Sequence, residues 1–285
     1  MTLLPFPVRS PGESILRTHL CCSLAIRALL ASTIAFAAVA QAPTHARTAT
    51  PVSIPTLTPP APGYVFPDHE TLTFSVDWRV FNGGTAVFHL ERQGAVEKVN
   101  ASADTIGNLT MIFPVVDKFQ AGFNRQTGCS TGFSKQVQEG RRKVSSDLTF
   151  NYPQGKQSET TRNLVQGTTA HREASIPACV ADSLSAIFYV ASQPLTVGHE
   201  FRFPLADSMR TITVAMKVEA REEIQTPAGT FQTIRVQPTA DEGVVKNRGN
   251  IWIWYTDDSR HLPVQIRARL FWGTITFHLR SVEAK

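Results

Sequence analysis

The sequence predicts a mainly β protein: a large curved antiparallel sheet or open β-barrel with one significant α-helix. Three observations predict this fold. Apolar and polar residues alternate over most of the chain after residue 63, as in half-buried strands. Short clusters of Gly, Asn and Asp separate the alternating segments. A single segment of sufficient length has helical spacing. We expect about 12 strands, and open sheets of that size tend to curl.

The N-terminal segment predicts export. Arg27 leads into an uncharged apolar run that ends in Ala38-Val39-Ala40, the small-x-small pattern of a secretory cleavage site. The run is about a dozen residues long, which is too short to span a bilayer. We therefore interpret residues 1–40 as a signal peptide and expect a periplasmic, or alternatively secreted, protein. No later segment is apolar enough to be a transmembrane helix.

Residues 41–63 are rich in Pro, Thr and Ala and show no hydrophobic period. Such a composition predicts a disordered arm. A single β-rich domain is then expected over residues 64–285, beginning near Tyr64. The formal net charge of the whole chain is +5, which gives no argument for a nucleic-acid partner.

The first expected strand is Glu70–Phe81, where apolar residues occupy every second position. Asn82-Gly83-Gly84 follows and predicts a tight hairpin turn, because Asn and Gly accept positive φ angles. The chain returns through a second strand that contains Ala86, Phe88 and Leu90, and a third strand is expected over Val96–Ile106. Leu109–Val116 is apolar on all sides and contains Pro114, which predicts a buried helical turn or crossover.

The middle of the chain continues the alternation. Lys118–Asn124 is the next expected strand, and Gly132–Gln138 and Arg141–Tyr152 form a hairpin around Glu139-Gly140. Lys156–Asn163 is a polar strand, which we place at an edge of the sheet.

The one convincing helix is Asp182–Ser192. Asp182 is a favourable N-cap, apolar residues share one face, and Pro194 ends the pattern. The remaining expected strands follow the helix. They are His199–Leu205, Thr211–Glu223, Phe231–Pro238, Gly249–Thr256, Leu262–Phe271 and Thr274–Val282.

The segment Ile251–Tyr255 is apolar on both faces, whereas a strand of a one-sided sheet has one polar face. Two interpretations are open. Both faces belong to the core, with the helix covering one of them, or part of this surface forms a ligand groove. For the groove, the candidate ligand-binding residues are Trp78, Trp252, Trp254 and Phe271.

Two cysteines remain after the expected cleavage, Cys129 and Cys179. In an oxidising compartment an even number of cysteines predicts a disulfide. The alternative is two unrelated buried thiols. Neither has a second cysteine two to four residues away, so we expect no metal site.

The chain lacks the motifs of nucleophilic catalysis, zinc hydrolysis and phosphate binding. Asp257, Asp258 and His261 are a compact carboxylate–imidazole group, but they fall in an expected hairpin turn, where Asp is favoured for backbone reasons. The basic run Arg141–Lys143 is a solvated hairpin tip or, alternatively, a dock for phosphate or an anionic lipid headgroup. We therefore expect no enzyme activity and no cofactor.

The order of several short motifs resembles the bacterial envelope family catalogued as domain of unknown function 3108 (DUF3108). The matching segments are Glu70–Trp78, Gly83–Ala86, Val116–Phe119, Glu139–Arg142, Asp182–Tyr189, Thr226–Phe231 and Trp254–Pro263. The resemblance implies an exported β-sheet domain with no assigned activity. More loosely, the expected architecture is similar to that of periplasmic lipoprotein carriers, whose curved sheet is plugged by a helix. That is a likeness of fold alone.

Three functions remain open from the sequence. The first is a non-catalytic envelope protein that binds a lipid or another hydrophobic small molecule within the curved sheet. The second is a protein-interaction or scaffold module of the cell envelope, which meets its partner through edge strands or through Arg141–Lys143. The third, and least favoured, is a hydrolase that uses Asp257, Asp258 and His261.

Overall fold

The computed structural model describes residues 55–79, 81–107, 109–112, 114–240, 246, 250–270 and 273–284. The expected signal peptide, most of the expected arm, and Phe271 lie outside these residues. Among the described residues, no helix has the length and apolarity needed to span a bilayer.

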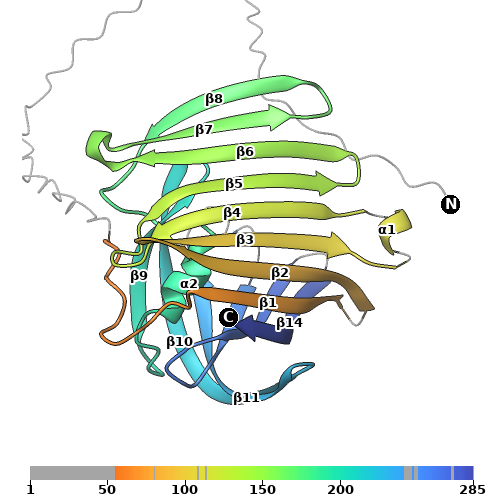
Figure 1. Ribbon diagram of the computed structural model, residues 1–285, viewed down its shortest axis with the longest axis vertical. Helices are drawn as coiled ribbons and strands as arrows, with labels where there is room; N and C mark the ends of the chain where they lie inside the picture. Colours follow the sequence, from red (N-terminus) through yellow and green to blue (C-terminus); the bar gives the residue numbers. More distant parts are fainter. Residues whose placement is uncertain are drawn as a thin grey trace, which may run out of the picture. The chain divides into compact units, whose positions relative to one another are not determined.

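The described chain folds mainly into strands of one sheet (Figure 1). The strands are β1 (His69–Trp78), β2 (Phe81–Gln93), β3 (Val96–Thr105), β4 (Val116–Asn124), β5 (Ser130–Glu139), β6 (Arg142–Asn151), β7 (Lys156–Asn163), β8 (Thr168–Ser175), β9 (Glu200–Asp207), β10 (Arg210–Thr226), β11 (Gly229–Thr239), β12 (Asn250–Thr256), β13 (Pro263–Leu270) and β14 (Gly273–Ala284).

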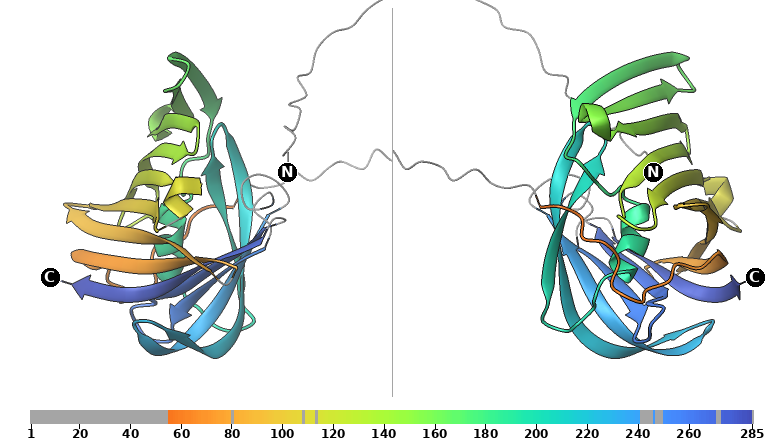
Figure 2. Two further views of the ribbon diagram at one scale, coloured as in Figure 1. Left: turned by 90° about the vertical axis from the view of Figure 1, so that its right-hand side faces the viewer. Right: turned by 60° about the vertical axis from the view of Figure 1, so that its left-hand side comes forward.

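The 14 strands form two meanders, β1–β8 and β9–β14, which are joined where β1 pairs with β14. All named strand pairs are antiparallel, and β8 and β9 are the two edges. The sheet curls around the helix α2 (Ser185–Ala191) without closing into a barrel (Figure 2). The predicted fold class is therefore confirmed.

The segment between β8 and α2 crosses from one meander of the open sheet to the other. Between β8 and α2, Ala181 makes an isolated parallel bridge with Leu205 of β9. One residue earlier, the carbonyl of Val180 accepts from the backbone N–H of Ser130 at 2.9 Å. This short crossing segment therefore contacts both meanders.

The turn between β1 and β2 differs from the expected one. Trp78 pairs with Phe81, and Arg79, which follows Trp78, has φ of 58°. The expected turn glycines lie within β2, where the register shifts by one residue. A Cβ on Gly84 would lie 2.6 Å from the carbonyl oxygen of Asp104. That glycine permits close strand approach rather than a turn.

Two further local expectations are wrong. The predicted buried turn in Leu109–Val116 contains a helical turn, α1 (Leu109–Ile112), but Met111 on it is 82% exposed. The predicted edge strand corresponds to β7, whereas the edge is β8, which the prediction missed. Strand β8 is solvent-exposed along nearly all its length and carries no apolar alternation that would have revealed it.

The ordered chain begins before the boundary expected at Tyr64. Leu57 is 8% exposed and belongs to the core. The backbone N–H of Thr58 donates to the Tyr189 hydroxyl at 3.2 Å, and its own hydroxyl donates to Gln193 at 2.8 Å. Residues 55–63 thus include a segment packed on α2, because a Pro-rich composition still leaves apolar and hydroxyl side chains to use.

Besides a small group formed by Leu148, Val180 and Ala206, the core consists of two large clusters of buried side chains. One includes Ile253 and Tyr255 of β12 together with residues of β9, β10, β11 and α2. The other includes Trp254 of β12 together with residues of β1, β2, β3, β4 and α2. The residues of both faces of β12 therefore join the core, which explains why Ile251–Tyr255 is apolar on both faces.

Candidate functional site

Side chains and backbone bonds fix α2 inside the curve of the sheet. Asp182 accepts from the backbone N–H groups of Leu184 and Ser185, both at 2.9 Å, and so caps the start of the helix. Its second oxygen accepts from the hydroxyls of Ser130 and Ser185, both at 2.6 Å. Further along, the Tyr255 hydroxyl donates to the carbonyl of Ile187 at 2.8 Å.

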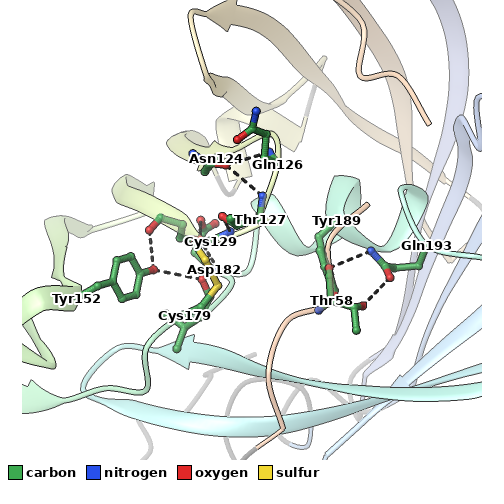
Figure 3. The surroundings of a disulfide bond; sticks show 12 residues. Thr58, Asn124, Gln126, Thr127, Cys129, Tyr152, Cys179, Asp182, Tyr189 and Gln193 are labelled. Carbon is green, nitrogen blue, oxygen red and sulfur yellow. Dashed lines mark hydrogen bonds between the residues drawn. A yellow bond between two sulfur atoms is a disulfide. The ribbon is translucent and has the colours of Figure 1, made fainter. Parts of the chain in front are cut away.

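A disulfide lies directly beside this cap (Figure 3). Cys129 and Cys179 are bonded to each other across a sequence separation of 50 residues. The predicted pairing is therefore confirmed. Gly128, next to it, has φ of 75°, and a Cβ there would lie 2.8 Å from the Tyr189 ring. The disulfide thus ties the β4–β5 connection closely to the segment that leads into α2.

A pocket of about 470 Å³ opens where α2 meets one end of the sheet. Its apolar walls come from the segment before β1, the end of β2, the last turns of α2 and the start of β13. The main apolar wall residues are Phe66, Leu90, Phe188, Ala191, Leu262 and Pro263. Its volume falls within the range of pockets that bind small molecules.

Three arginines also line this pocket, and each contacts a carboxylate. Arg92 and Arg125 both reach Asp68, at 3.2 and 3.3 Å. Arg260 contacts Glu70 at 2.8 Å. The side chains of Arg92 and Arg260 are more than half exposed, so part of their donor capacity faces solvent.

Arg125 is the most enclosed of the three arginines. It donates to Glu97 at 3.0 Å and to the carbonyl of Phe66 at 2.7 Å. The side chain of Glu97 is fully buried, and its second oxygen has no hydrogen-bond partner among the described residues. Burial therefore raises the pKa of Glu97 to about 7, although the charge of Arg125 opposes the rise.

Burial also raises the pKa of Glu70, against the opposing charge and hydrogen bond of Arg260. When every group is ionised, three arginines balance Asp68, Glu70 and Glu97. Protonation of Glu97 would leave this cluster with one excess positive charge. The pocket therefore combines an apolar interior with guanidinium groups at its opening.

The carboxylate–imidazole group of the sequence does not converge. Asp257 pairs with Arg221 at 2.6 Å, and Asp258 accepts from the backbone N–H of Arg260 at 3.0 Å. His261 donates through Nδ1 to the carbonyl of Ala191 at 2.7 Å. These side chains bond to different partners. Within the described ranges, no three His, Cys, Asp or Glu side chains gather as a metal ion would require.

The tryptophans chosen from the sequence do not form one groove. Trp254 is 4% exposed and donates to Glu222 at 2.6 Å, while Arg267 lies over its ring. Trp252 is partly buried against the same cluster as Trp254. Across strands β12, β13, β14 and β1, Trp252 is in register with Asp77, so these two side chains face the same side of the sheet. Trp78, the next residue of β1, therefore faces the opposite side. Phe271 lies outside the described residues.

The pocket residues were missed because no local pattern unites them. They come from six separate stretches of chain, and four of these contribute only one or two residues. Arg125, for example, stands in a turn after β4, where a basic residue is unremarkable in sequence. One signal was available: His261 was noticed, but as part of a turn and not together with Glu70.

A family model matches most of the chain, and one solved structure supports the fold. The sequence profile described as "Protein of unknown function (DUF3108)" matches residues 73–280. A β-barrel-like protein of domain of unknown function DUF1849 from Brucella abortus has a similar structure, with a TM-score of 0.52 and 8% identity over 78% of this chain and 99% of that one. A protein of YmcC-like fold from Bacteroides fragilis has a TM-score of 0.35 and 8% identity, over 77% and 99% of the two chains. Among curated proteins, none matches the chain.

Proposed function

The chain belongs to the DUF3108 family of proteins of unknown function, and from this premise we propose that it is a non-catalytic protein of the bacterial envelope that binds a lipid-like ligand. The pocket of about 470 Å³ beside α2 is the observation that carries the proposal. The ligand class is an amphiphile with an apolar tail and an acidic headgroup.

The chemistry of the pocket supports that class. Phe66, Leu90 and Phe188 give an apolar interior, which favours burial of hydrocarbon. Arg92 and Arg260 stand at the opening with exposed guanidinium groups, which suit carboxylate or phosphate oxygens. Trp252 and Trp254 are a weaker choice of site, because Trp254 is already packed and hydrogen-bonded within the protein.

The disulfide supports an oxidising compartment outside the cytoplasm. We place the mature protein in the periplasm, after removal of residues 1–40.

The interaction-module alternative gains less support from the edge strand β8, because its Arg172 and Glu173 are paired with Glu159 and Lys156 of β7. Charged side chains of this kind protect an edge from further strand pairing.

Binding of a fluorescent long-chain fatty acid tests the proposal. The variants Val65→Asp and Arg92→Met alter the opening of the pocket at exposed positions, and Asp68, the partner of Arg92, is itself exposed, so the fold should be retained. Each should weaken binding about tenfold, because each loses an apolar or charge-assisted contact of roughly 1–2 kcal/mol. Matched controls at exposed positions that do not line the pocket are Val197→Asp and Arg202→Met.

Equal binding by all four variants and the unaltered protein would reject this pocket as the site. Absence of any saturable binding by the unaltered protein would reject the lipid-like ligand class.

A further inference from the structure

The exposed apolar residues of the described chain concentrate at one end of the first meander. Four connections lie at this end: β1–β2, β3–β4, β5–β6 and β7–β8 (right-hand side of Figure 1). We call these connections, together with the strand residues that flank them, the hairpin rim. Of nine exposed large hydrophobic residues among those described, seven belong to the rim: Trp78, Phe81, Ile106, Met111, Val116, Leu164 and Val165.

The hairpin rim is one connected structure rather than four independent loops. The backbone N–H of Ile106 donates to Gly83 at 3.1 Å, which joins the first two connections. Gly140 donates to Pro114 at 2.9 Å, and Leu164 donates to Lys143 at 2.9 Å. These bonds link each connection to the next. The exposed side chains are therefore held in a row before any partner arrives, which lowers the entropic cost of binding.

Positive charge accompanies the apolar side chains. Arg79 lies over the ring of Trp78, with 5.7 Å between its guanidinium carbon and the ring centroid. Arg141, Arg142 and Lys143 form the exposed β5–β6 tip, where Arg142 pairs with Glu139 at 3.2 Å. Asp104 is an exposed carboxylate at the same end. With the largely buried Asp117, three carboxylates stand against four cations, and the positive excess lies on the exposed β5–β6 tip.

We propose that the hairpin rim docks onto the surface of an anionic phospholipid bilayer. Apolar and aromatic tips standing beside Arg and Lys suit a membrane interface, where the tips enter the headgroup layer and the cations meet lipid phosphates. The exposed apolar tips are spread over four connections at the ends of eight neighbouring strands, which favours a broad surface over a peptide.

This inference does not rest on the lipid-like ligand proposal, because the pocket lies at the opposite end of the same strands. Strand β1 has 10 residues, so the two ends are about 30 Å apart. A protein docked by its rim would therefore turn the pocket opening away from the membrane.

Vesicle flotation tests the rim directly. The mature protein should float with vesicles of phosphatidylglycerol and phosphatidylethanolamine and should not float with phosphatidylcholine vesicles. The variant Arg141→Gln/Lys143→Gln should lower the partition coefficient about tenfold or more at low salt. Phe81→Ser/Met111→Ser should lower it several-fold even though the charge is unchanged.

Matched control variants remove the same kinds of side chain from exposed positions outside the rim. Arg202→Gln/Lys217→Gln removes two cations from exposed positions of β9 and β10, and Val197→Ser removes an exposed apolar side chain. These variants should partition like the unaltered protein. Fatty-acid binding should persist in the rim variants, which separates failure of this inference from failure of the pocket.

Two results would overturn the inference. One is an absence of binding to anionic vesicles, or equal binding by rim and control variants. The other is a dominant crosslink in cells from the rim to one envelope protein, without crosslinks to lipid.

Discussion

The two ends of β2 show how one strand serves two different environments. Leu90, near its last residues, is 1% exposed and contributes to the pocket wall and the core. Phe81, its first residue, is 69% exposed on the hairpin rim. The difference arises because α2 and the segment before β1 cover only the pocket end.

The charged side chains at the two ends of the strands also differ in their burial. At the pocket end, Arg125 and Arg260 bond to the buried carboxylates of Glu97 and Glu70. At the rim, Arg141–Lys143 stand on an exposed tip. The comparison teaches that the pocket end is built by internal pairing, whereas the rim leaves apolar and cationic groups available to an external partner. Four predictions can break or sharpen this contrast.

The largest effect is expected from the disulfide beside the pocket end. Replacing both cysteines, Cys129→Ser/Cys179→Ser, should lower the free energy of unfolding by about 4 kcal/mol, because a loop of about 50 residues is no longer closed in the unfolded chain. Urea unfolding measures the loss, and the unaltered protein with reductant should match the variant. A loss below about 1 kcal/mol would show that the bond does not constrain the unfolded chain.

The next effect compares the two ends of β2 directly. Leu90→Ala should cost about 3 kcal/mol, because it leaves a cavity in the core. Phe81→Ala is its matched control and should cost less than about 0.5 kcal/mol, since its side chain already faces solvent. Thermal and urea unfolding of both variants measure the difference. Equal costs would contradict the contrast between the ends.

Removal of the helix cap should have a smaller effect. Asp182→Ala should cost about 2 kcal/mol, because four donors to this buried carboxylate lose their acceptor. Asp182→Asn retains an acceptor oxygen for the helix N–H groups and should lose less. If the two variants unfold at the same urea concentration, the backbone cap contributes nothing measurable.

The smallest effect, over any single pH unit, is the pH dependence of stability. The pKa of Glu97 is raised to about 7 in the fold, so the native state holds its proton more tightly than the unfolded chain does. Its contribution to stability is therefore fully present below the ordinary glutamate pKa and is lost as pH rises through about 7.

For this one group, the slope between those values should be at most about 1.4 kcal/mol per pH unit. Unfolding free energies measured across this window check the slope, and Glu97→Gln should flatten it. A variant with the same slope as the unaltered protein would assign the pH dependence to other groups, such as Glu70.

Much of the fold could be predicted because strand alternation is local. The alternation in Glu70–Phe81 and the clean hairpin around Glu139-Gly140 indicated strands that the structure contains. The polar strand β8 was invisible, because with nearly all of its residues exposed it needs no apolar period. Gly83-Gly84 suggested a turn, yet Gly84 is required by the close approach of β3, a contact that no sequence window contains.

The candidate site was less predictable than the fold. The tryptophans attracted attention by size, but the position of Trp254 depends on Glu222 and Arg267, which come from two other strands. The pairing of Cys129 with Cys179 was correct because only two cysteines follow the expected cleavage site. The pocket depends on how α2 meets five distant segments, and that arrangement is a property of the curled sheet.

Native mass spectrometry of the mature protein, released gently from the periplasm and followed by organic extraction, tests the central claim most directly. We predict a bound species of lipid size that is lost on denaturation and is depleted in the variants Val65→Asp and Arg92→Met. A clean mass of the protein alone, or a bound lipid retained equally in both variants, would contradict a lipid-like ligand in the pocket beside α2.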